Sequence, residues 1–331
     1  MRDVQLQRLT AALIGHDADP GRPPLRRAGA AVLTGALVAA LVAGGLAAYR
    51  MVTGGGLADP TDPSVILLDR RSGARYVFLE TDRRLHPVLN YTSGLLLAAG
   101  EQPEVKPVSQ ARLARVPLGA TLGIPGAPDA LPPAENLIRD AWTVCTDRAA
   151  RTSLLVGAAP PGAPAGERAL LVHDPTGRTF LVGGGARRRL PAERAVQWFG
   201  RSPALVAAAW IDAVPAGPDL FSPPGPPPAG LADFAVRACV TRPADGPASV
   251  RLDPALPPGV TPVPRGRGAV VTATSGVTHV VTDDGRACPL SSRDLLPRLG
   301  YAGVEPVTVP AELVALLPAG PLLDRELAGR R

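Results

Sequence analysis

SGARYVFLETDRRLHP, which runs from Ser72 to Pro87, is the first of three stretches with one pattern; the others are TGRTFLVGGGARRRLP (176–191) and SGVTHVVTDDGRACP (275–289). Each begins with a small polar residue and a glycine, continues through a short apolar run, a turn and a second short run, and reaches a proline 13 or 14 residues after the glycine. The runs VILLD, LLVHD and AVVTAT precede them and can pair across the glycine turn. We therefore predict three copies of a strand, turn, strand, turn, short strand and helix, as in a duplicated scaffold. The repeat positions are Gly73, Gly177 and Gly276 at the turn and Pro87, Pro191 and Pro289 at the end.

The helix at the end of each copy has local start and stop signals. Pro87 and Pro191 are expected at first helical positions, where a missing N–H costs nothing. Ser291 with Asp294 resembles a capping box in the third copy. A glycine follows each run of helix formers, as is usual just past a helix C-terminus. These glycines are Gly100, Gly200 and Gly300.

The stretch from Ala28 to Ala48 carries 21 residues without a charge. At about 1.5 Å per residue, such a helix spans the roughly 30 Å hydrocarbon core of a bilayer. Three arginines (22, 26 and 27) precede it and only Arg50 follows closely, so the positive-inside rule places residues 1–27 in the cytoplasm. We predict an uncleaved membrane anchor with the rest of the chain exported. The leader segment 4–15 has helical apolar spacing, which suits the inner membrane face, a partner helix or a solvated helix equally.

Composition indicates a folded exported part with long loops, because 39 Pro and 36 Gly accompany 46% apolar residues. The net charge of +6 comes almost entirely from arginines scattered among 29 acidic residues, which argues against nucleic-acid binding. The basic clusters DRRL (82–85) and RRL (188–190) are interpreted as solvated faces. The stretch 202–214, SPALVAAAWIDAV, predicts a capped helix that buries Leu205 and Trp210.

Three cysteines in an exported domain favour one disulfide and one remaining thiol. Cys145 ends the strand-like AWTVC and Cys239 lies in the alternating run DFAVRACVT, so we predict the pair Cys145–Cys239. Cys145–Cys288 is the alternative, although Cys288 stands at a repeat position that suggests a buried core thiol. No metal site is predicted, because the four histidines are dispersed and no CxxC or HxxxH spacing occurs.

Motifs of common enzymes are missing from the sequence. It contains no GxSxG, no HExxH and no GxxxxGK[ST], and Lys106 is its only lysine. The glycine run 183–185 and the acidic pair Asp283 and Asp284 both fit turns better than ligand sites. We therefore predict no catalytic residue and no cofactor.

Several segments together resemble the EccB family of actinobacterial type VII secretion systems. They are, in order, the basic leader, the single span, DPSVILLDRRSGARYVFLETDRRLHPVLNYTSGLLL (62–97), LGATLGIPGAPDALPP (118–133), AWTVC (141–145) and the closing VEPVTVPAELVALLPAGPLLD (304–324). The resemblance implies an inner-membrane core subunit whose elongated exported domain has a central domain flanked by repeats. It also implies assembly with EccC, EccD, EccE and the mycosin protease, together with homo-oligomeric contacts. Members have been described as ATPases.

The chain departs from the family in being short, with one repeat missing or eroded and a Pro-rich passage (221–233) in place of longer structure. The predicted fold is α+β: one transmembrane helix and an exported domain of β-hairpin-plus-helix repeats around a central mixed or β domain. The predicted role is structural, at the inner membrane, with an ATPase or a binding module for cell-wall polymer as alternatives. The predicted division is leader 1–27, span 28–48, linker 49–60, first repeat 61–105, central domain 106–165 and 201–262, second repeat 166–200, third repeat 263–318 and tail 319–331.

Overall fold

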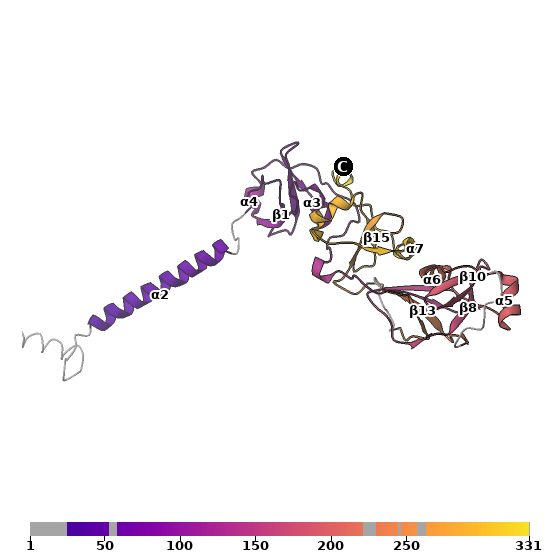
Figure 1. Cartoon of the computed structure of the whole chain (residues 1–331). Helices are drawn as coiled ribbons and strands as arrows, with labels where there is room; N and C mark the ends of the chain where they lie inside the picture. Colours follow the sequence, from indigo (N-terminus) through magenta and orange to yellow (C-terminus); the bar gives the residue numbers. More distant parts are fainter. Residues whose placement is uncertain (1–24, 53–57, 221–229, 244–245, 257–262, 331) are drawn as a thin grey trace, which may run out of the picture. The chain divides into compact units, whose positions relative to one another are not determined.

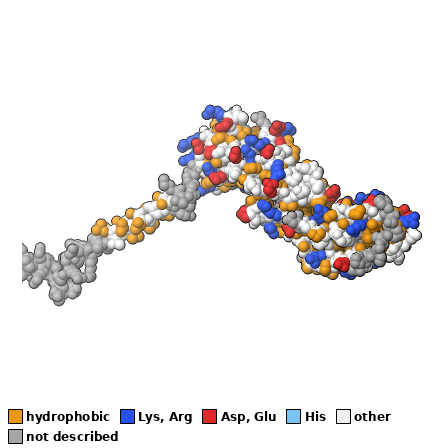
Figure 2. All heavy atoms as spheres, viewed as in Figure 1, with side chains coloured by type: hydrophobic (Ala, Val, Ile, Leu, Met, Phe, Trp, Pro, Cys, Tyr) orange, Lys and Arg blue, Asp and Glu red, His pale blue; other side chains and the backbone are white. Residues whose placement is uncertain are grey.

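The computed structural model describes residues 25–52, 58–220, 230–243, 246–256 and 263–330. The chain forms two compact units, Met1–Leu57 and Ala58–Arg331 (Figure 1). The first contains helix α2 (Leu25–Val52), which includes the predicted span 28–48. Hydrophobic side chains occur all along its described part (Figure 2). Among the described residues, no helix combines the length and hydropathy needed to cross a membrane. The predicted leader helix 4–15 lies outside the described residues.

Three sheets of the second unit share one topology. Three consecutive antiparallel strands are followed by a fourth that pairs in parallel with the first, on its free side. The first sheet has β1 (Ile66–Asp69), β2 (Arg75–Leu79), β3 (Arg84–Pro87) and β4 (Val105–Val108). The second has β8 (Ala169–His173), β9 (Thr179–Gly183), β10 (Ala186–Leu190) and β11 (Ala204–Leu205), with β12 (Leu231–Ala232) also on β8. The third has β15 (Ala269–Ala273), β16 (Thr278–Val281), β17 (Ala287–Pro289) and β18 (Val307–Val309). The fold is therefore mixed α+β with several sheets.

In each of the three repeats, further structure that the sequence did not predict follows the fourth strand. After the fourth strand comes a short helix, namely α4 (Gln110–Leu113), α6 (Ala208–Ala213) or α7 (Ala311–Val314). A Pro-x-Gly segment then runs beside the third strand: Leu85 N donates to Pro117 O at 2.9 Å, and Gly119 N donates to Leu85 O at 2.8 Å. Arg187 and Ala287 make the same two bonds with their own Pro-x-Gly segments. We call the segments 66–122, 169–220 and 269–323 module 1, module 2 and module 3. The predicted boundaries at 105 and 200 fall inside modules 1 and 2, and the division into domains stays a prediction.

A fourth sheet contains the two predicted cysteine strands. Its order is β6-β5-β13-β14-β7, and all of its pairings are antiparallel. The strands are β5 (Trp142–Asp147), β6 (Thr152–Val156), β7 (Ala163–Pro164), β13 (Arg237–Arg242) and β14 (Ser249–Leu252). Trp142 and Val144 are buried in one core with residues of modules 2 and 3, so this sheet joins those modules.

The repeated prolines are not all equivalent in register. Pro87 lies opposite Tyr76, and Pro289 lies opposite His279. The equivalent residue of module 2 is Phe180, which lies opposite Arg189 and not opposite Pro191, two residues further along the chain. The cause is the hairpin turn. Only Gly184 and Gly185 connect β9 to β10, whereas residues 80–83 connect β2 to β3, so β10 extends further before its proline.

The helices after the third strands also start differently from the prediction. Pro87 ends β3, where its carbonyl accepts from Leu122 N at 2.9 Å and its missing N–H is not needed. Helix α3 (Tyr91–Leu97) begins instead after Asn90, whose side chain accepts from Ser93 N. Pro191 is the N-cap residue of α5 (Ala192–Phe199), not its first helical residue. In module 3 the N-cap is Ser292, which starts η2 (Arg293–Leu295).

The predicted helix 202–214 is interrupted. Residues 204–205 form β11, which pairs with β8, and Val206 N donates to His173 O at 3.0 Å. Helix α6 therefore begins only at Ala208, because pairing with the sheet edge holds the preceding residues extended. Trp210 is buried as predicted, whereas Leu205 is only partly buried.

Modules 1 and 3 share a core, although about 150 residues of other structure separate them in the chain. Helix α3 packs against η3 (Pro297–Tyr301) and against α8 (Arg325–Ala328). The guanidinium groups of Arg298 and Arg325 donate to carbonyls at the C-terminal end of α3. Tyr301 donates its hydroxyl to Pro132 O at 2.9 Å in the same core. The C-terminal segment thus fastens onto the first module.

Candidate functional site

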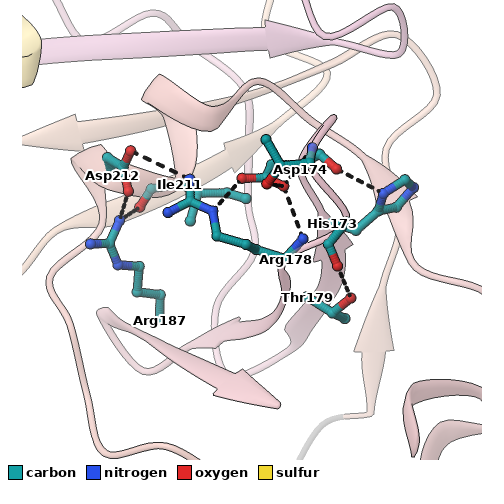
Figure 3. A network of polar contacts seen from close by, with 9 residues as sticks. His173, Asp174, Arg178, Thr179, Arg187, Ile211 and Asp212 are labelled. Carbon is teal, nitrogen blue, oxygen red and sulfur yellow. Dashed lines mark hydrogen bonds and ion pairs between the residues drawn. The ribbon is translucent and has the colours of Figure 1, made fainter. Parts of the chain in front are cut away.

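A network of ion pairs and hydrogen bonds lies in module 2, between the sheet and α6 (Figure 3). The carboxylate of Asp174 is fully buried and accepts bonds from Thr176 Oγ1 at 2.7 Å, from Arg178 N at 3.0 Å and from Arg178 Nε at 2.6 Å. Arg187 pairs with Asp212 and also donates to Ile211 O at 2.7 Å. We call Asp174, Arg178, Arg187 and Asp212 the module 2 network.

The network is electrostatically satisfied. Both guanidinium groups lie about 6 Å from the centre of the Phe180 ring, within range of a cation–π contact. Burial raises the pKa of Asp174, but the bonds from Thr176 and Arg178 outweigh it and hold the pKa below its usual value. Asp174 is therefore ionised at neutral pH, and its charge is paired. These ion pairs connect the strands of module 2 to α6.

The same place in module 3 is a groove. The strand registers and the Pro-x-Gly segments align Asp174, Arg178, Phe180, Arg187 and Asp212 with Ala273, Val277, His279, Ala287 and Ala315. The five residues of module 3 are smaller than their module 2 counterparts or uncharged, and they line a hollow of about 450 Å³. Burial lowers the pKa of His279, which keeps the imidazole neutral. The groove surface is consequently uncharged, whereas two arginines and two aspartates of module 2 form three ion pairs at the same place.

Module 1 fills the corresponding place with apolar side chains. Phe78 and Leu85 are buried there with Leu113 of α4, and Tyr76 packs against them. Asp69 keeps the turn role of Asp174, accepting from Arg71 N at 3.0 Å and from Ser72 Oγ at 2.6 Å. The three modules therefore share a backbone but present three different surfaces between sheet and helix.

A disulfide joins Cys145 to Cys239, which lie directly opposite each other on β5 and β13. Cys288, the alternative partner, is buried in the core of modules 1 and 3 and takes no part in a disulfide. Burial, with a smaller contribution from Asp284, raises the pKa of the Cys288 thiol to about 11, so this thiol is protonated and unreactive at neutral pH.

The predicted turn glycines occupy equivalent positions in the three modules. Gly73, Gly177 and Gly276 all have positive φ, at 76°, 84° and 91°, as the turn before each second strand requires. In the part of the chain that the structure describes, no three His, Cys, Asp or Glu side chains are close enough together to hold a metal ion.

Sequence reasoning missed the module 2 network and the Pro-x-Gly segments. A solvated face is the interpretation of the cluster 188–190, and Arg189 is indeed exposed. Arg187, the residue just before this cluster, instead turns inward and bonds to Asp212. The motif was readable in VPLG (116–119), VPAG (214–217) and LPAG (317–320), which follow the three short helices.

Comparison with known proteins identifies the family. Residues 4–240 match the family model described as type VII secretion system ESX-1, transport TM domain B, named EccB. The chain belongs to the EccB family. It is 34% identical over 238 residues to the ESX-3 secretion system ATPase EccB3 of Mycolicibacterium smegmatis. This alignment covers 66% of this chain and 44% of that protein. It is 28% identical over 341 residues to the ESX-5 secretion system ATPase EccB5 of Mycobacterium tuberculosis, covering 96% and 60%. This EccB chain thus spans about half the length of the curated relatives it matches.

Solved structures show the same fold. A chain of the intact ESX-5 inner membrane complex aligns with a TM-score of 0.59 at 20% identity, covering all of this chain and 94% of that one. A chain of the EccB3 dimer from the ESX-3 core complex aligns with a TM-score of 0.58 at 19% identity, covering 81% and 100%. The architecture of this EccB chain is therefore shared with subunits of secretion complexes.

Proposed function

We propose that this EccB chain is a structural subunit of the inner-membrane core complex of a type VII protein secretion system. The observation that carries the proposal is the family match over residues 4–240, to which the fold of the ESX complex subunits adds support. A duplicated scaffold with differing module surfaces suits a part that contacts several neighbours. The satisfied charges of the module 2 network suit it as well, because they leave no reactive pair.

The membrane anchor is part of this proposal. Residues 28–48 carry no charge, and the described apolar side chains of α2, among them Val32, Leu37 and Leu41, are exposed along the helix. A bilayer is the environment in which such a surface is stable. The arginine bias supports a cytoplasmic N-terminus, with the unit from Ala58 onwards outside the cytoplasm. The disulfide between Cys145 and Cys239 is consistent with an oxidising compartment.

A reporter fusion tests the orientation. Alkaline phosphatase, active only outside the cytoplasm, is fused after Arg331, and a fluorescent protein that folds only in the cytoplasm is fused at the same point. We expect active phosphatase and no fluorescence. The reverse result would overturn the exported placement.

Copurification tests the proposed role. The tagged full chain is extracted in mild detergent from its native membrane, and the proposed partners EccC, EccD, EccE and mycosin are sought by mass spectrometry. We expect stoichiometric secretion subunits. A parallel pull-down on isolated peptidoglycan separates the cell-wall alternative, since retention there without any secretion subunit would replace the proposal.

Nucleotide hydrolysis, which the names of the relatives carry, is not part of the proposal. This sequence has no GxxxxGK[ST] element. Its only lysine, Lys106, lies in β4 and is paired with Leu67 of β1 in the sheet. An ATPase assay of the purified chain tests this. ATP turnover that a point substitution abolishes without unfolding the chain would show that the chain hydrolyses ATP.

A further inference from the structure

His86 of module 1 is a buried histidine whose two ring nitrogens both face oxygen atoms. Its side chain is 3% exposed. Nδ1 lies 2.7 Å from the carbonyl oxygen of Ala120, and Nε2 lies 2.9 Å from Oδ2 of Asp82. A carbonyl oxygen and an ionised carboxylate can only accept a hydrogen bond, so each nitrogen has to donate. Both bonds therefore form only when the imidazole carries two N–H groups and a positive charge.

The two bonds connect parts of module 1 that are separate in the chain. Asp82 belongs to the turn between β2 and β3, His86 lies in β3, and Ala120 directly follows the Pro-x-Gly segment. The ring also lies against Gly119 of that segment, where an added Cβ would overlap it. The imidazole thus fastens the Pro-x-Gly segment to the turn and to the third strand.

The same position carries a different side chain in each module. The strand registers align His86 with Arg188 and Cys288, and each lies against the glycine of its own Pro-x-Gly segment. An arginine stays charged over the whole physiological range, and burial raises the pKa of Cys288 to about 11. Histidine is the side chain whose charge ordinarily changes between pH 5 and 8. Module 1 is therefore the module in which this contact changes with pH near neutrality.

Asp82 is the charged group that faces the ring. Burial raises the pKa of Asp82, but the bond and the positive charge of His86, together with a bond from Arg84 N, hold it below its usual value. The stabilising contribution of this carboxylate is therefore present above the unfolded-state pKa of about 3.9 and is lost as the pH falls through the folded-state pKa. Near neutrality Asp82 is ionised and balances the charge of the ring.

The other charged groups on the elements around the ring are bonded elsewhere or exposed. The guanidinium of Arg84, on the same face of β3, donates to a carbonyl of the Pro-x-Gly segment at 3.2 Å. Arg75 of β2 forms an ion pair with Asp129 at 2.8 Å. Helix α3 and residues 117–122 contain no charged residue. The exposed groups, in the turn before β3, are Glu80 and Arg83.

We propose that His86 is a pH-dependent clamp, which holds the Pro-x-Gly segment of module 1 against β3 as an imidazolium and gives up one of its two bonds when it loses a proton. A neutral ring has a single N–H, so its other nitrogen then presents a lone pair to an oxygen. The contribution of the histidine is present in acid and is lost as the pH rises past the range in which imidazole titrates, about pH 6.5 for a histidine in water. Residues 117–122 are consequently held more firmly at pH 5.5 than at pH 7.5.

The clamp rests on the proposed function in one respect. Export gives module 1 a surrounding whose pH the cytoplasm does not buffer, so that the clamp responds to the outside of the cell. The two ideas fail separately. A cytoplasmic position of the C-terminal reporter would overturn the exported placement and leave the chemistry of His86 as it is.

Hydrogen exchange in the wild-type full chain tests the clamp, with modules 2 and 3 as internal controls. The chain is purified in detergent, and exchange is followed by mass spectrometry at pH 5.5 and pH 7.5, each rate being corrected for the intrinsic effect of pH. We expect the protection of β3 and of residues 117–122 to fall by about threefold to tenfold at the higher pH, as loss of one hydrogen bond implies. Residues 215–220 and 318–323 should keep their protection. An equal change in all three modules, or none in module 1, overturns the proposal.

Substitution and ring-nitrogen NMR provide the second test. His86→Gln keeps an N–H donor but cannot titrate, so its residues 117–122 should be equally protected at both pH values. His279→Gln is the matched control, since His279 is a partly buried histidine of module 3 whose pKa burial lowers, and it should behave like wild type. In wild-type chain with 15N-labelled histidine, both ring nitrogens of His86 should carry hydrogen at pH 5.5 and only one at pH 8. A single N–H on this ring at pH 5.5 contradicts the clamp, whatever the variants show.

Discussion

A single glycine in each module sets how closely the Pro-x-Gly segment approaches the third strand. In module 3 a Cβ on Gly320 would overlap Cys288 Sγ and press on Ala287 O at 3.3 Å. In module 2 a Cβ on Gly217 would find its nearest atoms at 3.3 Å, which small shifts relieve. The glycine requirement is therefore steric, and its strength differs between modules.

We predict that Gly320→Ala lowers the free energy of unfolding by about 1–3 kcal/mol, the usual cost of overpacking a filled core. Gly217→Ala, the matched control, should cost less. Because the clash is with one sulfur atom, Cys288→Ala combined with Gly320→Ala should restore a large part of the loss, which a double-mutant cycle in urea measures. Strict additivity of the two substitutions would show that Cys288 is not the obstacle.

A second residue-scale prediction concerns Asp174. Its buried carboxylate has a pKa held below its usual value, so its contribution to stability is complete above the unfolded-state pKa of about 3.9 and is lost as the pH falls through the folded-state pKa. Asp174→Asn should cost about 1–3 kcal/mol at pH 7. The difference from wild type should persist down to about pH 4 and shrink below it. Urea unfolding at several pH values measures this, with the exposed Asp219→Asn as control; a difference that grows in acid would contradict the argument.

At the scale of elements, the disulfide joins two neighbouring inner strands of the fourth sheet, β5 and β13. It closes a loop with a sequence separation of 94, for which the chain-entropy account gives about 4.7 kcal/mol of stabilisation. The loop includes all of module 2. Loss of the bond should therefore lower the unfolding free energy of that module as well as of the sheet.

We predict that reductant lowers the urea midpoint of the wild-type chain and leaves a Cys145→Ala, Cys239→Ala double variant unchanged at an already lowered midpoint. Cys288→Ala should respond to reductant like wild type, since that thiol is outside the bond. A reductant effect that survives in the double variant would place the cause elsewhere.

Some strands could be predicted from local sequence signals, whereas others depend on long-range pairing. The three meanders were predictable because glycine turns and apolar runs are local signals, and AWTVC and DFAVRACVT were readable as strands for the same reason. The fourth strands were missed because β4, β11 and β18 are short and gain their conformation only by pairing with β1, β8 and β15. The module 2 network was missed because the inward turn of Arg187 depends on Asp212, 25 residues away. Long-range pairing, not local propensity, decided each of these.

At the scale of the whole molecule, the C-terminal segment connects the last module to the first. Asp324 caps α8 by accepting from Leu327 N at 2.9 Å, and Arg325 Nε donates to Leu96 O at 3.1 Å on α3. Ala328 is fully buried in the shared core. Part of the packing around α3 thus comes from residues more than 200 positions away, so the stability of module 1 depends on the C-terminal segment.

We predict that removal of residues 324–331 loosens module 1 more than module 2. Without α8, the carbonyls at the end of α3 lose the Arg325 donor and the core around Leu95 and Leu96 opens to water, so amide exchange in α3 should quicken by about tenfold or more. Amides of β8 and β9 should exchange as before. Arg325→Ala, which removes the donor while keeping the helix, should reproduce part of the effect in hydrogen-exchange mass spectrometry of the full chain. Faster exchange spread evenly over modules 1 and 2 would mean that the truncation lowers global stability, and the idea of a latch between the last module and the first would then be wrong.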